Sequence, residues 1–228
     1  MKSKIDIADL DCIYLTYDET QKEEFWVRIK NMVPWAKRVD GVKGSDAAHK
    51  AAAEASNTDR FILIDGDNLP DPSFFNQTLV LPTEEYERAV FRWRARNHIN
   101  GLMYGNGGLS SWTKEFVYAM QTHEHSNGSV ETQVEFCFDP LYWPMYDCFS
   151  TTYPNGSAFH AWRAGFREGV KMCLNRGAKP SVTRLSSEAI NDAGSLDTAL
   201  FDAGLLMNGL IMLGTAIAFL FMLTWLSN

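Results

Sequence analysis

Apolar and polar residues form two different patterns in the first third of the chain. Cys12 to Thr16 is a short apolar run that closes in polar residues, whereas Gln21 to Met32 carries apolar side chains three and four positions apart. The first pattern predicts a strand, and the second predicts a helix with one apolar face. Pro34 ends this helix, because proline cannot continue the helical hydrogen-bond pattern.

The alternation continues downstream. Ala36 to Val42 predicts a second strand, alanine-rich Ala47 to Ser56 predicts a second helix, and Phe61 to Ile64 predicts a wholly apolar third strand. Strands that alternate with helices form parallel sheets through right-handed crossovers. The sequence therefore predicts an α/β fold in which a mostly parallel, Rossmann-like central sheet has helices on both faces.

Two carboxylates follow directly on the third strand. Asp65 and Asp67 are separated by Gly66, and side chains two positions apart in an extended chain point the same way. Both carboxylates can therefore face one point at the carboxyl end of the strand, where α/β sheets bind ligands. Their oxygens suit Mg2+ or Mn2+, with a diphosphate supplying further ligands. A turn of Asp, Asn and Pro explains the same residues without a metal.

Other polar residues follow the first two strands or belong to the second helix. Because parallel strands end at one edge, we expect these residues beside Asp65 and Asp67. A nucleotide base and ribose would lie there, against Tyr17, Asp18, Asp40, His49 and Lys50.

Val90 to Asn97 alternates apolar and basic residues. One face of the expected strand carries Phe91, Trp93 and Ala95, and the other carries Arg92, Arg94 and Arg96. An arginine row can bind a diphosphate or the phosphates of a nucleic-acid acceptor. An edge strand with a solvated charged face explains the row equally well.

The stretch from Asn97 to Gly108 contains four glycines and three asparagines. We expect no regular element here, but a loop whose backbone can approach a sugar or a base closely. Tyr104 and Trp112 offer flat faces for stacking. An ordinary long loop is the alternative.

A further helix is expected to begin near Phe159. Arg163, Arg167 and Lys171 are four positions apart, so they share one face of it. These cations and the amino end of the helix can hold a diphosphate, although a salt-bridged surface helix has the same pattern.

Two parts of the chain carry a resemblance. Leu-Thr-Tyr-Asp-Glu at 15–19, the helix with His49 and Lys50, and Phe-Ile-Leu-Ile-Asp-Gly-Asp-Asn at 61–68 resemble the nucleotide-binding half of GT-A glycosyltransferases. In that fold an Asp-x-Asp motif holds a divalent metal on a nucleoside diphosphate sugar. Residues 96–108 and 155–171 look like the small GT-A transferases of tailed bacteriophages, which place sugars on hydroxymethylated pyrimidines in DNA.

The resemblance implies a GT-A enzyme that uses Mn2+ or Mg2+ and moves a sugar, most simply from a UDP-sugar, to a hydroxymethylated base in phage DNA. It places the metal on Asp65, Asp67 and His160. The donor would lie against Tyr17, Asp18, Asp40, Lys50, Asp65, Gly66, Arg163, Arg167 and Lys171. The acceptor would lie against Arg94, Arg96, Asn100, Tyr104, Gly107, Trp112 and Trp162.

Such a reaction needs a general base. Val134 to Phe138 predicts a strand that ends at Asp139, where an inverting transferase would place a base across from the donor. Glu124 is a second candidate, and Glu131 and Glu135 compete with both. The sequence does not rank them.

Charge and cysteine content limit the partners and the cellular compartment that we expect for the protein. The chain has 21 Lys plus Arg against 28 Asp plus Glu, and its formal charge of -7 argues against broad adhesion to nucleic acid. The four cysteines lack metal-binding spacing, and residues 1–10 lack a signal-peptide pattern. We therefore expect an intracellular protein, in the host cytoplasm if a phage encodes it.

The last residues differ from the rest. Ala203 to Leu226 contains no charged residue and is long enough to cross a bilayer. We expect a transferase domain over 1–202 and an apolar helix over 203–228, either buried or a membrane anchor. An anchor would favour a glycan or lipid-linked acceptor at a membrane. A nucleotide-binding scaffold without catalysis is the remaining alternative.

Overall fold

The computed structural model describes residues 3–122, 124 and 136–172, and of Asn106, Phe138 and 167–172 it describes the backbone alone. The chain divides into two compact units. The first contains Met1–Glu124 and Asp139–Gly156, and the second contains His125–Phe138 and Ser157–Asn228.

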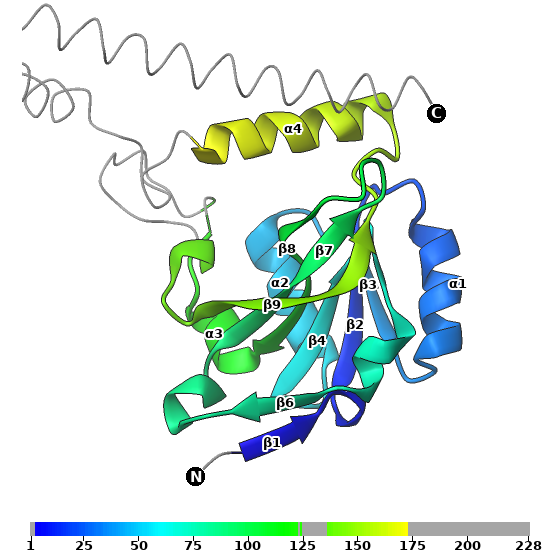
Figure 1. Ribbon diagram of the computed structural model, residues 1–228. Helices are drawn as coiled ribbons and strands as arrows, with labels where there is room; N and C mark the ends of the chain where they lie inside the picture. Colours follow the sequence, from blue (N-terminus) through cyan, green and yellow to red (C-terminus); the bar gives the residue numbers. More distant parts are fainter. Residues whose placement is uncertain (1–2, 123, 125–135, 173–228) are drawn as a thin grey trace, which may run out of the picture. The chain divides into compact units, whose positions relative to one another are not determined.

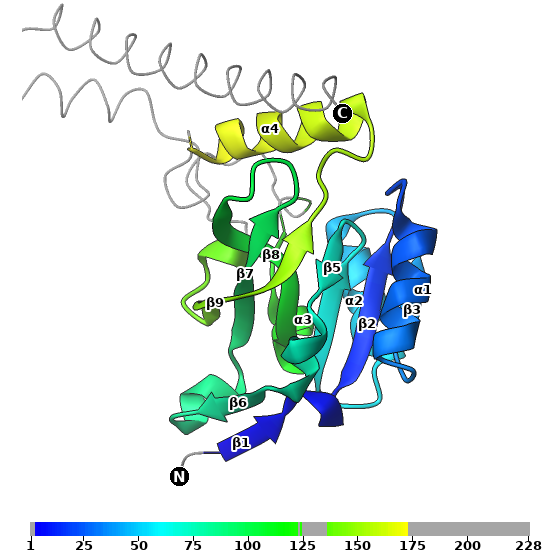
Figure 2. The ribbon, with the colours of Figure 1, turned by 45° about the vertical axis from the view of Figure 1, so that its right-hand side comes forward.

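A seven-stranded sheet forms the centre of the first unit (Figures 1 and 2). Its strand order is β3-β2-β4-β8-β7-β9-β5. The strands are β2 (Asp11–Thr16), β3 (Lys37–Asp40), β4 (Arg60–Asp65), β5 (Asn68–Pro70), β7 (Val90–Asn97), β8 (Met103–Thr113) and β9 (Tyr142–Thr152).

The sheet is mixed. β2 is parallel to both β3 and β4, and β7 is parallel to β9, whereas β8 is antiparallel to β4 and β7 and β5 is antiparallel to β9. The α/β class is confirmed, but the expectation of mostly parallel pairing is wrong. Because β8 reverses direction between β4 and β7, the strands β3, β2, β4, β7 and β9 nevertheless all run the same way.

The first strands and helices follow the predicted order. Helix α1 (Lys22–Met32) and helix α2 (Ser45–Ala55) connect β2, β3 and β4 within one or two residues of the predicted bounds. The four buried apolar residues of β4, Phe61 to Ile64, explain the position of α1, because its apolar face with Phe25 and Ile29 meets a strand that is apolar on both faces.

Alternate residues of β4 are buried under different helices. Ile62 and Ile64 share a core with Phe25 and Ile29 of α1. On the other face Phe61 pairs with Trp112, whose ring lies 4.9 Å from that of His49 in α2. The predicted helices on both faces are therefore present, and Figure 1 shows α2 behind the sheet.

Smaller elements complete the first unit. Strands β1 (Ser3–Asp6) and β6 (Thr78–Leu81) form a separate antiparallel pair. Helix α3 (Lys114–Ala119) follows β8, and short 3-10 helices are η1 (Ile7–Asp9), η2 (Pro72–Asn76) and η3 (Glu84–Glu87).

The glycine-rich stretch is partly a turn and partly a strand: residues 98–102 connect β7 to β8, as expected of a loop, whereas the rest corrects that expectation. Met103 to Gly108 belongs to β8, and its pairing with β7 is interrupted between Arg92 and Arg94, where β8 contributes extra residues. Glycines and asparagines fit here because the irregular segment is a bulge rather than a regular ladder. The bulge also increases the bend of the sheet near this edge.

In the second unit two helices are described. Helix α4 (Ala158–Met172) begins as predicted near Phe159, with the Ser157 hydroxyl accepting the His160 backbone N–H at 3.2 Å. Phe136–Phe138 is a 3-10 helix, η5, so the strand expected at 134–138 is wrong for these residues. The expected helix over 203–228, and Glu131, Glu135 and Cys173, lie outside the described residues. No helix within the described part of the chain is long and apolar enough to cross a membrane.

Candidate functional site

The carboxyl ends of β3, β2, β4, β7 and β9 lie at one edge of the sheet, because these strands run in the same direction. We call this the carboxyl edge. The loops that leave it carry Tyr17 and Asp18 after β2, Asp40 at the end of β3, Asp65 and Asp67 around the end of β4, and Tyr153 after β9. The strand directions put Tyr17, Asp18 and Asp40 at the same edge as the two carboxylates, as expected, whereas the ring of His49, also expected there, packs on buried Trp112.

A buried tyrosine, Tyr14, forms a hydrogen bond with the backbone of Gly66. The Tyr14 hydroxyl donates a hydrogen bond of 2.9 Å to the Gly66 carbonyl oxygen. Burial, and then the negative charge of Glu19, raise the pKa of Tyr14, so the phenol keeps the proton that it donates. This contact fixes the turn between the two carboxylates to the core.

Asp67 is oriented by a network that the sequence did not reveal. Its carboxylate accepts Asn68 Nδ2 at 2.8 Å and Thr152 Oγ1 at 3.5 Å, and Ser150 Oγ donates to Asn68 Oδ1 at 3.2 Å. Asn68, Ser150 and Thr152 are buried. The network ties Asp67 to β9, so a strand some 85 positions later positions the motif.

A third carboxylate lies against the motif. Glu19 Oε2 accepts the Tyr17 backbone N–H at 2.8 Å, and its carboxylate fills the space into which a side chain on Gly66 would project. Reasoning from the sequence missed the role of Glu19, because one more acidic residue in a polar loop carries no signal without its spatial neighbours.

Asp65 and Asp67 are the candidate ligands of a divalent metal. Carboxylates are the right donors for Mg2+ or Mn2+. Across the described residues, however, no group of three His, Cys, Asp or Glu side chains has a metal-binding arrangement. Asp65 and Asp67 alone would leave most ligand positions of such an ion to diphosphate oxygens and water.

Asp40 is already engaged by cations. Its Oδ1 accepts Lys22 Nζ at 2.7 Å and Thr16 Oγ1 at 2.6 Å, and Arg38 lies at 3.4 Å. The Lys22 hydrogen bond, followed by that of Thr16, lowers the pKa of Asp40. Tyr17 beside it is 46% exposed and presents a ring at this edge.

Lys50 and Glu124 both contact residues at the start of α2. Lys50 forms an ion pair of 2.7 Å with Asp46. The Glu124 carboxylate accepts the backbone N–H groups of Ser45 at 2.8 Å and Asp46 at 2.9 Å, so it caps the helix. Because α2 follows the end of β3, Glu124 lies at the carboxyl edge.

The arginine row lies on an internal strand. β7 pairs with β8 and β9, so the edge-strand alternative is wrong. The Arg92 guanidinium lies 5.5 Å from the centre of the Tyr142 ring, and that of Arg94 lies 4.2 Å from the Tyr146 ring. Arg96 is exposed. The three arginines therefore have different surroundings and do not form one uniform phosphate-binding row.

The remaining acceptor residues separate into buried and accessible ones. Trp112 is 1% exposed and packs on His49 and Phe116, so it cannot stack on an acceptor, which corrects that prediction. Gly107 lies against the Tyr142 hydroxyl. Asn100 Oδ1 accepts the Leu102 N–H at 3.0 Å within the β7–β8 turn, and Tyr104 is partly exposed.

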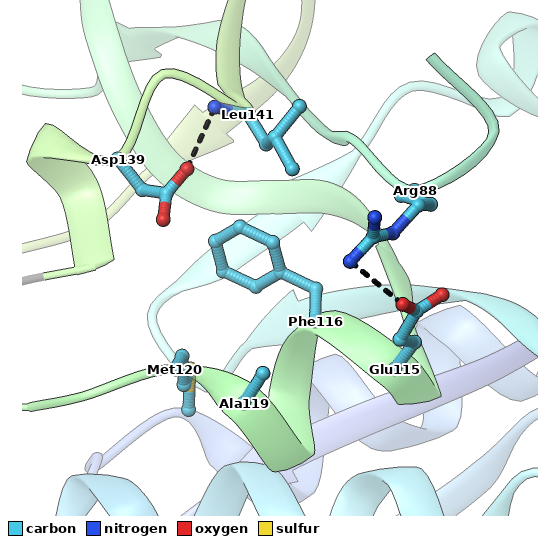
Figure 3. A pocket seen from close by; sticks show the side chains of 7 residues that line it. All are labelled: Arg88, Glu115, Phe116, Ala119, Met120, Asp139 and Leu141. Carbon is cyan, nitrogen blue, oxygen red and sulfur yellow. Dashed lines mark hydrogen bonds and ion pairs between the residues drawn. The ribbon is translucent and has the colours of Figure 1, made fainter. Parts of the chain in front are cut away.

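Asp139 lies at the opposite edge of the sheet. It precedes β9 instead of ending a strand, because its backbone oxygen accepts the N–H of Tyr142, the first residue of β9. Figure 3 shows it in a pocket with Phe116, near the Arg88–Glu115 ion pair. Arg88, Glu115, Phe116, Ala119, Met120, Asp139 and Leu141 line this pocket. The structure therefore does not bring Asp139 together with Asp65 and Asp67.

His160, Trp162, Arg163, Arg167 and Lys171 belong to the second unit and are described by themselves. His160 Nδ1 lies 2.6 Å from Ser157 Oγ at the start of α4, and the Arg163 guanidinium lies 5.6 Å from the centre of the Phe159 ring. Trp162 is exposed. Arg167 and Lys171 lie within α4.

The fold and the carboxyl edge define a mixed α/β protein with a carboxylate-rich candidate site. No family model and no curated protein sequence matches the chain. Among solved structures it is similar to a glycosyltransferase involved in the glycosylation of the major capsid of PBCV-1. The two chains are 13% identical, the match covers 71% of this chain and 99% of the other, and the TM-score is 0.40. A TM-score this low does not establish a shared fold.

Proposed function

We propose that the protein is a glycosyltransferase that takes its sugar from a nucleoside diphosphate donor, with UDP as the first choice. The observation that carries the proposal is the Asp65-Gly66-Asp67 turn at the end of the central buried strand. Tyr14 anchors this turn and Asn68 orients Asp67. Such fixed carboxylates at the carboxyl edge are typical of sites that handle charged ligands.

The charges at this edge favour a divalent cation. Asp18, Glu19, Asp65 and Asp67 are all acidic, while Lys22 already pairs with Asp40. A diphosphate would be repelled by these carboxylates in the absence of a positive charge between them. A bound Mn2+ or Mg2+, held by Asp65 and Asp67, would supply that charge and neutralise the departing diphosphate.

The protein's own residues would position the donor. Tyr17 offers an exposed ring for the base, and Asp40 and Asp18 offer acceptors for the ribose hydroxyls. The expectation that Arg163, Arg167 and Lys171 hold the diphosphate and that His160 binds the metal stays a prediction from the sequence. Glu124 stays a candidate base because it lies at the carboxyl edge, whereas Asp139 is not carried into the proposal.

For the acceptor we propose a hydroxymethylated base in DNA. The support is the exposed Arg96, the Arg94–Tyr146 stack and the accessible Asn100 and Tyr104 near the end of β7 and the start of β8. A glycan or lipid-linked hydroxyl at a membrane is the alternative, which the uncharged run over 203–226 favours.

Hydrolysis of the donor tests the enzyme class without an acceptor. UDP-sugars are incubated with the protein with and without Mn2+, and release of UDP is measured. We expect metal-dependent release that Asp65→Ala and Asp67→Ala abolish, while Glu115→Ala, at the opposite edge, retains it. Equal UDP release by all variants would show that Asp65 and Asp67 do not carry the reaction. It would reject the catalytic proposal in favour of a nucleotide-binding scaffold.

Mass spectrometry identifies the acceptor. Hydroxymethylated DNA, unmodified DNA and no DNA are each combined with the same donors at low and high salt. Transfer to hydroxymethylated DNA that weakens with salt is expected, because phosphate contacts depend on ionic strength. Donor hydrolysis without any transfer to DNA would leave the enzyme class intact and reject the DNA acceptor.

A further inference from the structure

Helix α4 carries an exposed aromatic stripe. Phe159, Trp162 and Phe166 are spaced three and four positions apart, and they are 59%, 46% and 52% exposed. Their ring centres are 6.4 Å and 5.2 Å apart along the helix, so the three rings form one continuous surface. Exposed apolar surfaces of this kind mark interaction sites.

The stripe is not the packing face of the helix. Among residues 158–166 of α4, for which burial is described, Ala161 and Gly165 are the buried ones, and they lie four positions apart on another side of the helix. The large aromatic residues are therefore not on the buried side. The stripe is therefore a surface that the described fold leaves for a partner.

Positive charge borders the stripe. The Arg163 guanidinium lies over the Phe159 ring, 5.6 Å from its centre. The sequence of α4 continues this row with Arg167 and Lys171 and contains one acidic residue, Glu168, so the helix is basic in a chain with a formal charge of -7. Aromatic residues beside a basic row are typical of helices that lie in the membrane interface.

We infer that α4 binds an anionic lipid surface, with Phe159, Trp162 and Phe166 in the headgroup region and the basic row against lipid phosphates. Aromatic rings suit this depth because they combine apolar area with a polar or polarisable edge. Arg163 can keep its charge at the headgroups while its stem covers Phe159. This inference goes beyond the transfer reaction and does not rest on it.

Two other partners fit less well. The uncharged segment 203–226 could cover the aromatic rings, but it contains no acidic residue to meet the basic row. Single-stranded nucleic acid could meet the basic row, but Trp162 and Phe166 are stacked on each other with an interplanar angle of 14°, which occupies faces that bases would need. An anionic bilayer satisfies both the rings and the charges.

Hydroxyl-radical footprinting of the full chain tests the inference, because it reads the accessibility of individual side chains. The probes are vesicles of phosphatidylcholine alone, vesicles with about a third phosphatidylserine, and single-stranded DNA. We expect oxidation of Trp162 to fall about threefold or more with the anionic vesicles only. Trp35, which is 42% exposed in the first unit, serves as the internal control and should not change.

Variants of the full chain complete the test. Arg163→Gln should weaken partitioning onto the anionic vesicles about fivefold, as expected for one basic residue at such a surface. In the Trp162→Ser variant, anionic vesicles should protect Phe159 and Phe166 from oxidation less than in the unaltered protein. Val27→Ser, an exposed apolar control on α1, should leave this protection unchanged. Low oxidation of Trp162 without vesicles, protection by DNA alone, or no protection by anionic vesicles would each overturn the inference.

Discussion

The Glu19 carboxylate occupies the space beside Gly66 in which any other residue would place its side chain. A side chain at position 66 would have to displace the end of the Glu19 side chain, and the backbone angle of Gly66 is not unusual. The same contact brings a third negative charge to the turn between Asp65 and Asp67.

Gly66→Ala should therefore destabilise the protein by about 0.5–1.5 kcal/mol, because the Glu19 carboxylate has to move and gives up its hydrogen bond to the Tyr17 N–H. Urea unfolding measures the change. Glu19→Ala empties the space, so the double variant should be more stable than the sum of the two single effects predicts. Simple additivity would show that Glu19 and Gly66 are not in contact.

Asn68→Ala should impair the binding of a metal–donor complex more than it impairs folding. Asn68 donates to Asp67 and accepts from Ser150, so its loss frees the Asp67 carboxylate to rotate. Residues that orient a ligand carboxylate contribute about 10–100-fold to metal affinity or activity. Mn2+ titration in the presence of UDP measures this. Ser150→Ala is the matched control, because it leaves the Asn68–Asp67 hydrogen bond in place, and an equal effect of both variants would contradict the prediction.

Glu124 has a structural role that can be separated from a catalytic one. Glu124→Ala removes the cap from Ser45 and Asp46 and should cost about 1 kcal/mol in the free energy of unfolding. Glu124→Gln keeps an acceptor oxygen and should retain most of this stability. Because glutamine cannot accept a proton as a base, a fall in kcat of about 100-fold or more in Glu124→Gln would identify Glu124 as the general base. Unchanged stability of Glu124→Ala would contradict the cap.

Protonation of His49 should destabilise the fold as the pH falls. Burial lowers the pKa of His49, against the opposing effects of the Ser45 carbonyl and the charges of Asp46 and Glu124. The folded protein thus binds a proton less readily than the unfolded chain, so stability is complete above about pH 6.5 and falls below it, by no more than about 1.4 kcal/mol per pH unit. Unfolding between pH 7.5 and 5 measures the slope. His49→Asn should remove this part of it, and the same slope in both proteins would assign it to other groups.

The start of the fold was predictable because its signals are local. The apolar run Phe61 to Ile64 and the helical spacing around Phe25 need only neighbouring residues to be recognised, and both elements appear within a few residues of their expected bounds. The position of Asp65 and Asp67 at a strand end follows from the same local pattern.

The later part was less predictable because long-range pairing decides it. Met103 to Gly108 has the composition of a loop, yet pairing with β7 makes it part of a strand. Trp112 is buried against His49 of α2, which is distant in the sequence, and Asp139 follows a 3-10 helix that was expected to be a strand. In such segments tertiary contacts override the secondary-structure propensity of the individual residues.

The sequence by itself determined that this is an α/β protein with two carboxylates on a buried strand and an uncharged run near its carboxyl end. Only the tertiary structure decided what surrounds them. It mixes the strand directions, adds Glu19 and Asn68 to the site, and moves Asp139 to the other edge. It also buries Arg60, and this burial lowers the pKa of Arg60 to about 10. The Arg60 guanidinium donates hydrogen bonds to Ser111 Oγ and to the backbone carbonyls of Tyr86 and Glu87. The physical reason is that hydrophobic spacing is encoded residue by residue, whereas burial and proximity depend on which distant strands pair.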